Sequence, residues 1–217
     1  MRPPTDRDEL VSRARDLAGR PLSELATGLG LPVPVDLRRD KGWIGQLVER
    51  ALGATGGPRE LCDFPHLGVE LKTIPVDGGG RPRESTWVCV APLDGSLARS
   101  WDRSRVCRKL ARVLWVPIRG EGPPGERVVD RPRLWRPTAA QEARLRADWE
   151  ALAELIELGE WWQLTARHGQ VLQVRPKAAS SRELVWVLDE EASWVRTNPR
   201  GFYLRRSFTA EVLATRG

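Results

Sequence analysis

Two charged residues stand one residue apart in a stretch that otherwise has the pattern of a buried strand. Residues 68–77 read GVELKTIPVD and contain Glu70 and Lys72. Because the side chains of a strand alternate between its two faces, both charges are expected on the same face. Asp63 comes seven residues before Glu70, and Glu49 belongs to the helix predicted before that. The sequence therefore brings three carboxylates and one lysine toward one end of a sheet.

Such a set suits the metal-assisted hydrolysis of a phosphodiester. Hard cations such as Mg²⁺ take oxygen ligands and commonly use a few carboxylates together with water and phosphate oxygens. Asp63, Glu70 and Glu49 are the candidate metal ligands. Lys72 is the candidate catalytic ammonium, which could hold or deprotonate a water molecule and neutralise charge on the phosphate. The alternative is a solvated strand face with cross-strand partners, since 29% of the chain is charged.

The use of lysine at position 72 is informative in itself. Only four of the 35 basic residues are lysines, which leaves 31 arginines, and the four are Lys41, Lys72, Lys109 and Lys177. Where arginine fills most cationic positions, a remaining lysine favours a site that needs a compact, titratable ammonium. The competing interpretation is that the four lysines remain by chance.

Composition limits the class of protein. With 217 residues, 41% apolar residues and ten tryptophans, the chain can form one domain with a sizeable core. The net charge of +6 is compatible with a polyanionic partner but is weak support on its own. No apolar run is long enough for a transmembrane helix, and the first ten residues, MRPPTDRDEL, carry charges where a signal peptide needs apolar residues. Three cysteines without a CxxC pair favour reduced thiols and a cytoplasmic location.

Alternating helical and strand patterns predict a mixed α/β domain. A helix over residues 41–52 would carry Glu49, with Gly45 leaving the helix face uncovered beside it. The strand that contains Glu70 is predicted to form a hairpin with residues 85–92, STWVCVAP, across a glycine-rich turn.

The second half of the chain has its own start and stop signals. A helix is predicted over residues 100–111, a strand over 113–118, and an irregular segment over the proline-, glycine- and arginine-rich residues 119–137. Thr138 with Gln141 forms a capping box that opens the longest helix, which Gly159 ends. Shorter strands and a last helix follow.

Several long motifs resemble the MutH family of mismatch-repair endonucleases, in order and over nearly the whole chain. They are DKGWIGQLVERALGA, DFPHLGVELKTIPVD, TWVCVAPL, RKLARVLWVP, ADWEALAELI, LTARHGQVLQVRPKA and PRGFYLRRSFT. The resemblance implies a restriction-endonuclease-like fold of the PD-(D/E)xK type, a mixed sheet flanked by helices, with Asp63, Glu70 and Lys72 at the motif positions. No proline directly precedes Asp63 here, but that position varies. The resemblance also assigns an additional acid to Glu49 and a supporting, catalytic lysine to Lys109.

The resemblance further implies the reaction and the partners. The family nicks the unmethylated strand of hemimethylated GATC DNA, 5′ to the guanine, and leaves 5′-phosphate and 3′-hydroxyl ends. It uses Mg²⁺ and is activated by the ATPase MutL. The expected architecture is a single nuclease domain over residues 1–217, with a catalytic arm (1–118) and a DNA-reading arm (119–217) around a DNA cleft. One catalytic set without an internal repeat suits a monomer that cuts one strand.

The sequence offers residues suited to reading the DNA. Arg167 has the forked donors that match guanine O6 and N7. Tyr203, the only tyrosine, could press against the adenine edge and detect its methyl group, although a tyrosine that merely packs on a strand is the alternative. Contacts to DNA are also expected from four cations: Lys41, Arg200, Arg205 and Arg206.

Two other functions remain open from the sequence. A restriction endonuclease of the same fold would cut both strands at GATC, which needs a second copy of the site through dimerisation or an additional domain. The short single-domain chain argues against it. A DNA-binding module could use the acids to hold a structural cation, and the complete set of Asp63, Glu70 and Lys72 argues against that.

Overall fold

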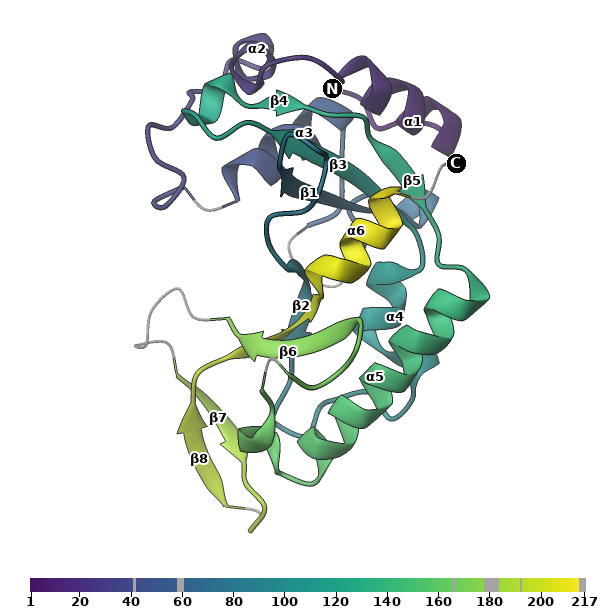
Figure 1. Cartoon of the computed structure of the whole chain (residues 1–217), viewed down its shortest axis with the longest axis vertical. Coiled ribbons are helices and arrows are strands. Elements are labelled where there is room, and N and C mark those ends of the chain that lie inside the picture. Colours follow the sequence, from purple (N-terminus) through teal and green to yellow (C-terminus); the bar gives the residue numbers. More distant parts are fainter. Residues whose placement is uncertain (41, 58–60, 166, 178–183, 192, 215–217) are drawn as a thin grey trace. The chain divides into compact units, whose positions relative to one another are not determined.

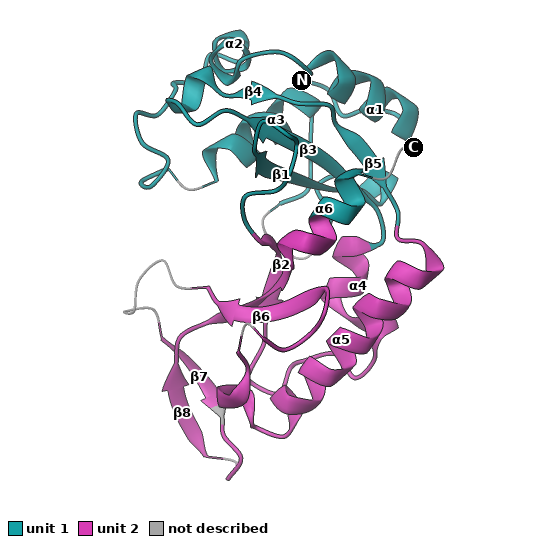
Figure 2. Ribbon diagram, viewed as in Figure 1, with its two compact units in different colours: residues 1–84, 111–136, 210–217 teal, residues 85–110, 137–209 magenta. Residues whose placement is uncertain are grey.

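In a computed structural model the chain forms two compact units of mixed α/β structure (Figures 1 and 2). The structure describes residues 1–40, 42–57, 61–165, 167–177, 184–191 and 193–214. Unit 1 consists of residues 1–84, 111–136 and 210–217, and unit 2 of residues 85–110 and 137–209. The two compact units do not show which segments contact DNA, so the division into two arms at residue 118 stays a prediction.

The sheet of unit 1 is built on two parallel strands. β1 (Glu70–Val76) pairs with β3 (Val113–Arg119) along its whole length. β4 (Val128–Val129) and β5 (Arg133–Trp135) pair with β3 in antiparallel orientation. All residues of β3 except the last are buried, as is usual for a strand that is covered on both faces. This mixed sheet with its helices confirms the predicted fold class.

Three helices supply the apolar side chains that pack with this sheet. They are α1 (Arg7–Asp16), α2 (Leu22–Gly28) and α3 (Trp43–Leu52). Two 3-10 helices, η1 (Pro65–Leu67) and η3 (Pro124–Glu126), lie in the connections. The buried core of the unit includes Leu10, Leu22, Leu47, Val48, Leu52, Phe64, Leu71, Leu114, Val116 and Ile118. The third helix was thus predicted correctly from residue 43 onward, while Lys41 lies outside the described residues.

Unit 2 contains a three-stranded antiparallel sheet in the order β2–β9–β6. The strands are β2 (Thr86–Ala91), β6 (Leu172–Pro176) and β9 (Arg200–Leu204), and β7 (Val185–Leu188) and β8 (Trp194–Thr197) form a separate hairpin. Helix α5 (Ala139–Glu157) packs against β6, and α4 (Arg105–Leu110) packs against β2 (Figure 1). The 3-10 helices η2 (Trp101–Arg103) and η4 (Trp161–Gln163) also belong to this unit, and the helix α6 (Arg206–Ala214) begins in unit 2 and ends in unit 1 (Figure 2).

The predicted hairpin between the strand of Glu70 and residues 85–92 is wrong. β1 takes β3 as its partner, and β2 pairs with β9. The glycine-rich turn does fold the chain back, because Val76 bridges Pro82, but the pairing ends there. Pairing with the buried strand β3 places β1 in the sheet that carries the core of unit 1.

Two smaller predictions also need correction. The helix expected over residues 100–111 is interrupted at Ser104, whose hydroxyl accepts a 3.0 Å hydrogen bond from the N–H of Cys107 and so starts α4 separately. The segment expected to be irregular contains η3, β4 and β5. No disulfide joins the three cysteines, and no helix in the described ranges is long and apolar enough to span a membrane.

Candidate active site

Glu70 and Lys72 lie at the start of β1 and contact each other, as the alternation of a strand predicts. The Nζ atom of Lys72 donates a 2.7 Å hydrogen bond to Oε1 of Glu70. The side chain of Glu70 is 4% exposed and that of Lys72 is 13% exposed. Burying a charged pair contributes little or nothing to stability compared with apolar residues of the same volume. The pair in this strand therefore points to a chemical role.

Asp63 is held directly beside this pair. Its Oδ2 atom accepts a 2.7 Å hydrogen bond from the N–H of Leu71, the residue between the two charges. Burial and the charge of Glu70 raise the pKa of Asp63 to about 6, with a smaller contribution from Glu49, although the bond from Leu71 and the charge of Lys72 oppose the shift. The cluster thus contains more negative charge than its single ammonium balances.

Glu49 joins the cluster from helix α3. A Cβ atom added to Gly45, one turn earlier, would lie 3.9 Å from Oε1 of Glu49 and 3.8 Å from Oγ1 of Thr73 on β1. Gly45 therefore keeps the helix face open next to the carboxylate, as the spacing predicted. Since the charge of Glu49 also contributes to the raised pKa of Asp63, the structure brings together all three predicted carboxylates and Lys72.

The donor set of this cluster matches a hard divalent cation. Asp63, Glu70 and Glu49 offer carboxylate oxygens. Burial first, and then the charges of Glu70 and Glu49, raise the pKa of Asp63, and a cation would offset these charges. Within the described part of the chain, no three acidic, histidine or cysteine side chains already have the arrangement of a metal site. The cluster is an acidic group that fits a cation in charge and chemistry, and it is not a preformed cage.

A close backbone crossing positions Asp63. The N–H groups of Thr55 and Gly56 donate to the carbonyl of Asp63 at 3.1 and 2.9 Å. A Cβ atom added to Gly56 would lie only 2.2 Å from the carbonyl oxygen of Cys62 and 2.7 Å from Cα of Asp63. Only a residue without a side chain lets the two segments meet at this distance.

We therefore expect Gly56→Ala to lower the free energy of unfolding by about 1–3 kcal/mol, because two backbone segments must separate. Gly57→Ala is the matched control, since no atom lies within 4 Å of a Cβ added there. Chemical denaturation of both variants measures the difference. If Gly56→Ala unfolded like Gly57→Ala, the crossing would not constrain the position of Asp63.

Other predicted site residues lie in unit 2. Lys109 is on α4 and is 8% exposed. Arg167 is exposed in the turn that follows η4, and Arg206 is exposed at the start of α6. The guanidinium groups of Arg200 and Arg205 donate to backbone carbonyls, to Leu164 at 2.7 Å and to Gly169 at 2.8 Å respectively. These two guanidinium groups are therefore held by hydrogen bonds within the protein and do not extend toward solvent like the exposed side chains of Arg167 and Arg206.

Tyr203 lies on the middle strand of the unit 2 sheet and is surrounded by aromatic and cationic side chains. Trp87 on β2 is directly opposite, with ring centroids 5.1 Å apart in an edge-to-face arrangement. The guanidinium of Arg175 on β6 lies 5.8 Å from the centre of the Tyr203 ring, and Nζ of Lys177 lies 5.3 Å from that of Trp87. We call these four residues, Trp87, Arg175, Lys177 and Tyr203, the reading face.

Arg175 was not among the predicted site residues. The motif that contains it was noted, but its place beside Tyr203 depends on the pairing of β6 with β9, in which Gln173 is opposite Tyr203 and Arg175 is opposite Gly201. The arginines of this chain are too numerous for residue type alone to single out one of them. The register in which β6 pairs with β9 is the feature that identifies Arg175.

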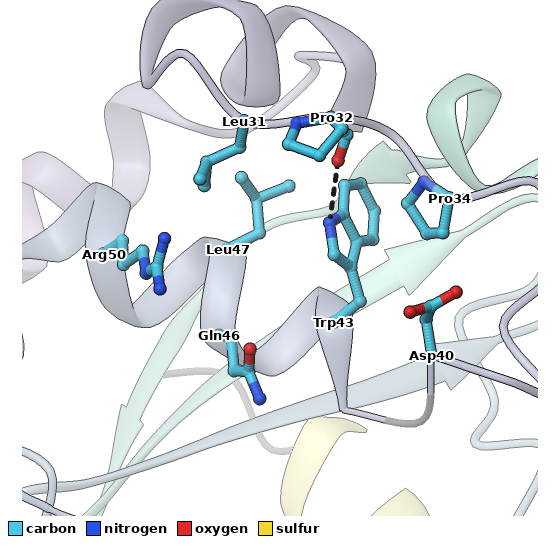
Figure 3. Close-up of a pocket in the computed structure, with 8 residues that line it drawn as sticks. All are labelled: Leu31, Pro32, Pro34, Asp40, Trp43, Gln46, Leu47 and Arg50. Atoms are coloured by element: carbon cyan, nitrogen blue, oxygen red, sulfur yellow. Dashed lines mark hydrogen bonds between the residues drawn. The ribbon is translucent and has the colours of Figure 1, made fainter.

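A hollow of about 320 Å³ in unit 1 adjoins another face of α3 (Figure 3). It is lined by Leu31, Pro32, Pro34, Asp40, Trp43, Gln46, Leu47 and Arg50. Nε1 of Trp43 donates a 3.2 Å hydrogen bond to the carbonyl of Pro32. Glu49 is not among the lining residues, so this mostly apolar pocket is separate from the acidic cluster.

Comparison with known proteins relates the chain to one family. A family model described as DNA mismatch repair enzyme MutH matches residues 52–148. A protein of Shewanella oneidensis named DNA mismatch repair protein MutH is 53% identical over 213 residues, which cover 97% of this chain and 96% of the relative. Proteins of the same name are 52% identical over 216 residues in Vibrio cholerae, covering 98% of both chains, and 54% identical over 213 residues in Shewanella baltica.

Proposed function

The chain belongs to the MutH family of DNA mismatch repair endonucleases, and on that premise we propose that it nicks the unmethylated strand of hemimethylated GATC DNA. The cut lies 5′ to the guanine and leaves 5′-phosphate and 3′-hydroxyl ends. The observation that carries the proposal is the buried pair of Glu70 and Lys72 beside Asp63, whose pKa is raised by burial and by Glu70. Such a cluster suits phosphodiester hydrolysis better than a structural role.

Asp63, Glu70 and Glu49 would hold Mg²⁺ through their carboxylate oxygens. When bound, the ion supplies an activated water and a positive charge for the attacked phosphate. The hydrogen bond from Leu71 to Oδ2 fixes the orientation of Asp63, and the bond from Lys72 to Oε1 fixes that of Glu70. The chain therefore presents its acids in set orientations, so that little rearrangement is needed during the reaction.

Lys72 supplies the N–H donors and the positive charge of the cluster. An ammonium group carries three N–H donors, and one of these is directed to Glu70. In this proposal the others hold the attacking water and a phosphate oxygen. The strand fixes the position of Nζ because Lys72 sits within a sheet, opposite Trp115 of β3. Lys109 is proposed as a second lysine that acts on the scissile phosphate.

The reading face provides DNA recognition in this proposal. Arg167 remains a candidate for contact with guanine, and Arg175 is a second one because its forked donors stand over the Tyr203 ring on a rigid strand. Tyr203 is proposed to test the adenine edge for the methyl group. Phosphate contacts are proposed for Lys41, Lys177 and Arg206.

The wider biological setting is proposed on the same premise. One acidic cluster among the residues that the structure describes suits a monomer that cuts one strand, with the ATPase MutL as activator and the cytoplasm as its location. A basic chain with a net charge of +6 suits a double-stranded DNA partner.

The direct test is strand-resolved cleavage of three GATC duplexes that are unmethylated, hemimethylated or fully methylated, with Mg²⁺ and with or without MutL. We expect a nick in the unmethylated strand only, and no cut of the fully methylated duplex. A scrambled site in the same duplex is the control. Cuts in both strands would favour a restriction endonuclease, and intact DNA under all conditions would favour a binding module.

Tyr203→Ala is expected to reduce the preference for the unmethylated strand by about tenfold, because it removes the ring against the adenine edge. It should also weaken binding to GATC, since Arg175 loses the ring beneath its guanidinium. Tyr203→Phe keeps that ring and should retain affinity while losing any discrimination that the hydroxyl provides. Nicking rates on the two strands of hemimethylated duplexes measure the preference. If Tyr203→Ala kept it, the methyl group would be sensed elsewhere.

A further inference from the structure

A buried carboxylate in unit 2 has no part in the chemistry proposed above. Asp148 lies on α5 and is 8% exposed. Its Oδ2 atom accepts hydrogen bonds from the N–H groups of three successive residues, Gln170, Val171 and Leu172, at 2.8, 2.6 and 2.8 Å. Its Oδ1 atom accepts a second bond from Gln170 at 2.9 Å. One carboxylate therefore holds the backbone where a turn becomes strand β6.

Arg205, just after β9, holds the same turn through its carbonyls. Its Nε donates to the oxygen of Gly169 at 2.8 Å, and its Nη2 donates to that of His168 at 3.2 Å. Its own N–H donates to Val171 at 2.7 Å. Asp148 thus accepts hydrogen bonds from the N–H groups of the turn, and Arg205 donates hydrogen bonds to its carbonyl groups. Charge-assisted bonds of this kind are stronger than neutral ones and fix a backbone firmly when they are buried.

The conformation of the turn depends on this arrangement. Gly169 has φ of 78°, and a Cβ atom added there would lie 1.9 Å from the carbonyl oxygen of Leu172 and 3.2 Å from Cγ of Asp148. Arg200 fixes the start of the turn, with a 2.7 Å bond from Nη1 to the carbonyl of Leu164 and its guanidinium 5.6 Å from the centre of the Trp161 ring. The backbone is tied at both ends.

The braced backbone leads directly to the residues proposed to read DNA. Arg167 lies within the turn, and β6 begins at Leu172, whose N–H is bonded to Asp148. The next residue of β6, Gln173, is opposite Tyr203, and Arg175 lies over the Tyr203 ring. A shift in the first residues of β6 would therefore move one side of the reading face.

We infer that Asp148 and Arg205 are positioning residues for DNA recognition, which hold residues 168–172 in the DNA-reading conformation before DNA binds. This rests on the proposed function. A recognition surface that is already ordered loses less entropy on binding, so the brace contributes to affinity for the cognate site without touching the DNA. It also gives Arg205 a role different from the phosphate contact expected from the sequence.

The test uses the full chain with two pairs of variants. Asp148→Asn has nearly the same shape as the wild type, but it replaces one acceptor oxygen by an NH₂ group that faces backbone N–H groups. Glu150→Gln, an exposed change of the same kind on the same helix, is its control. Arg205→Lys keeps the positive charge but loses the planar fork that reaches two carbonyls. Arg146→Lys, at an exposed position of α5 that has no part in the proposed DNA contacts, is the matched control for it.

Binding is measured by fluorescence anisotropy without divalent ions, on a GATC duplex and on a scrambled duplex, over a range of salt concentrations. We expect Asp148→Asn and Arg205→Lys each to weaken GATC binding by about tenfold and binding to the scrambled duplex by less than about twofold. The salt dependence should not change, because no phosphate contact is lost. Thermal unfolding of each variant reports whether the fold is retained.

The outcomes are distinct. A loss of GATC preference in folded Asp148→Asn or Arg205→Lys, with both controls like the wild type, supports the inference. If Asp148→Asn fails to fold, Arg205→Lys decides alone. Unchanged GATC preference in the folded variants overturns the inference. An equal loss of affinity of Arg205→Lys for both duplexes, with a shallower salt dependence, also overturns it and makes Arg205 a phosphate contact. A wild type without GATC preference would overturn the proposed function and this inference with it.

Discussion

Lys72→Ala is expected to lower the rate of strand cleavage by roughly three orders of magnitude while leaving DNA affinity nearly unchanged. The lysine is the ammonium of the acidic cluster and donates a 2.7 Å hydrogen bond to Glu70. Affinity should persist because it depends mainly on the many contacts that cations make to phosphates elsewhere. Single-turnover cleavage with saturating Mg²⁺, together with binding measured in EDTA, separates the two effects.

Loss of the ammonium also affects stability, and the effect must be told apart from catalysis. Lys72→Ala removes the ammonium that is bonded to the buried carboxylate of Glu70, and breaking a buried pair in this way typically costs about 3–5 kcal/mol. The double variant Glu70→Ala with Lys72→Ala removes both charges, so it should regain much of that stability. It should still be inactive. A stable but inactive double variant would show that catalysis, and not folding, requires the pair.

The control for the lost positive charge is Arg20→Ala. Arg20 lies just before α2, pairs on the surface with Glu24 and has no place in the cluster. This variant should cleave at the wild-type rate. Full activity in a folded Lys72→Ala protein would contradict the proposed mechanism and move the catalytic ammonium to another residue.

Features set by short-range patterns could be predicted from the sequence. The alternation of a strand put Glu70 and Lys72 on one face, and the structure joins them by a hydrogen bond. The capping box at Thr138 and Gln141 is present with both of its bonds, at 3.1 and 3.2 Å, and α5 starts where it predicts. Such signals act over a few residues, so the local sequence contains all the information they need.

Strand pairing could not be predicted in the same way. β2 pairs with β9, more than 100 residues later in the chain, and not with the neighbouring β1. No property of residues 85–92 indicates that partner, because antiparallel pairing depends on side-chain packing across the finished sheet. The short strands β4 and β5 were missed for a related reason. They stand among arginines, prolines and glycines that are typical of loops, and they become strands through pairing with β3.

The parts of the candidate site that escaped prediction depend on bonds between side chains and distant backbone. Asp148 is one acid among many in a helix, and only the folded chain brings it to the amides of residues 170–172. Arg175 gains its place beside Tyr203 from the register of two strands. Sequence patterns indicate which residue types a site needs, but they do not indicate which of many equivalent arginines or acids the fold uses.

Asp63→Asn is expected to abolish cleavage and, at neutral pH without divalent ions, to stabilise the fold by on the order of 2 kcal/mol. The folded protein raises the pKa of Asp63 from 3.8 to about 6, chiefly through burial and then through Glu70. Asparagine carries no charge to bury, and its side-chain oxygen can still accept the hydrogen bond that Leu71 donates to Asp63. The substitution therefore removes the free-energy cost of burying a charge and keeps the hydrogen bond from Leu71.

The sign of this effect gives it a characteristic pH dependence. Between the unfolded pKa of 3.8 and the folded pKa of about 6, the folded chain retains a proton at Asp63 that the unfolded chain has released. The wild type therefore loses stability as the pH rises through this interval, and the loss is complete above it. The advantage of Asp63→Asn should be absent at about pH 4 and full at neutral pH, as measured by chemical denaturation. Asp16→Asn, an exposed change on α1, should differ by no more than about 0.5 kcal/mol.

Magnesium connects this stability effect with the proposed function. A cation bound to Asp63, Glu70 and Glu49 would offset their charge, and it would bind only the folded chain, so adding Mg²⁺ should stabilise the wild type. Asp63→Asn lacks one of the ligands and should gain much less. The difference between the two proteins should then shrink or reverse as Mg²⁺ is added. Equal stabilisation of both would place the ion away from Asp63, whereas a crossover would mean that the chain keeps a destabilising carboxylate because the metal needs it.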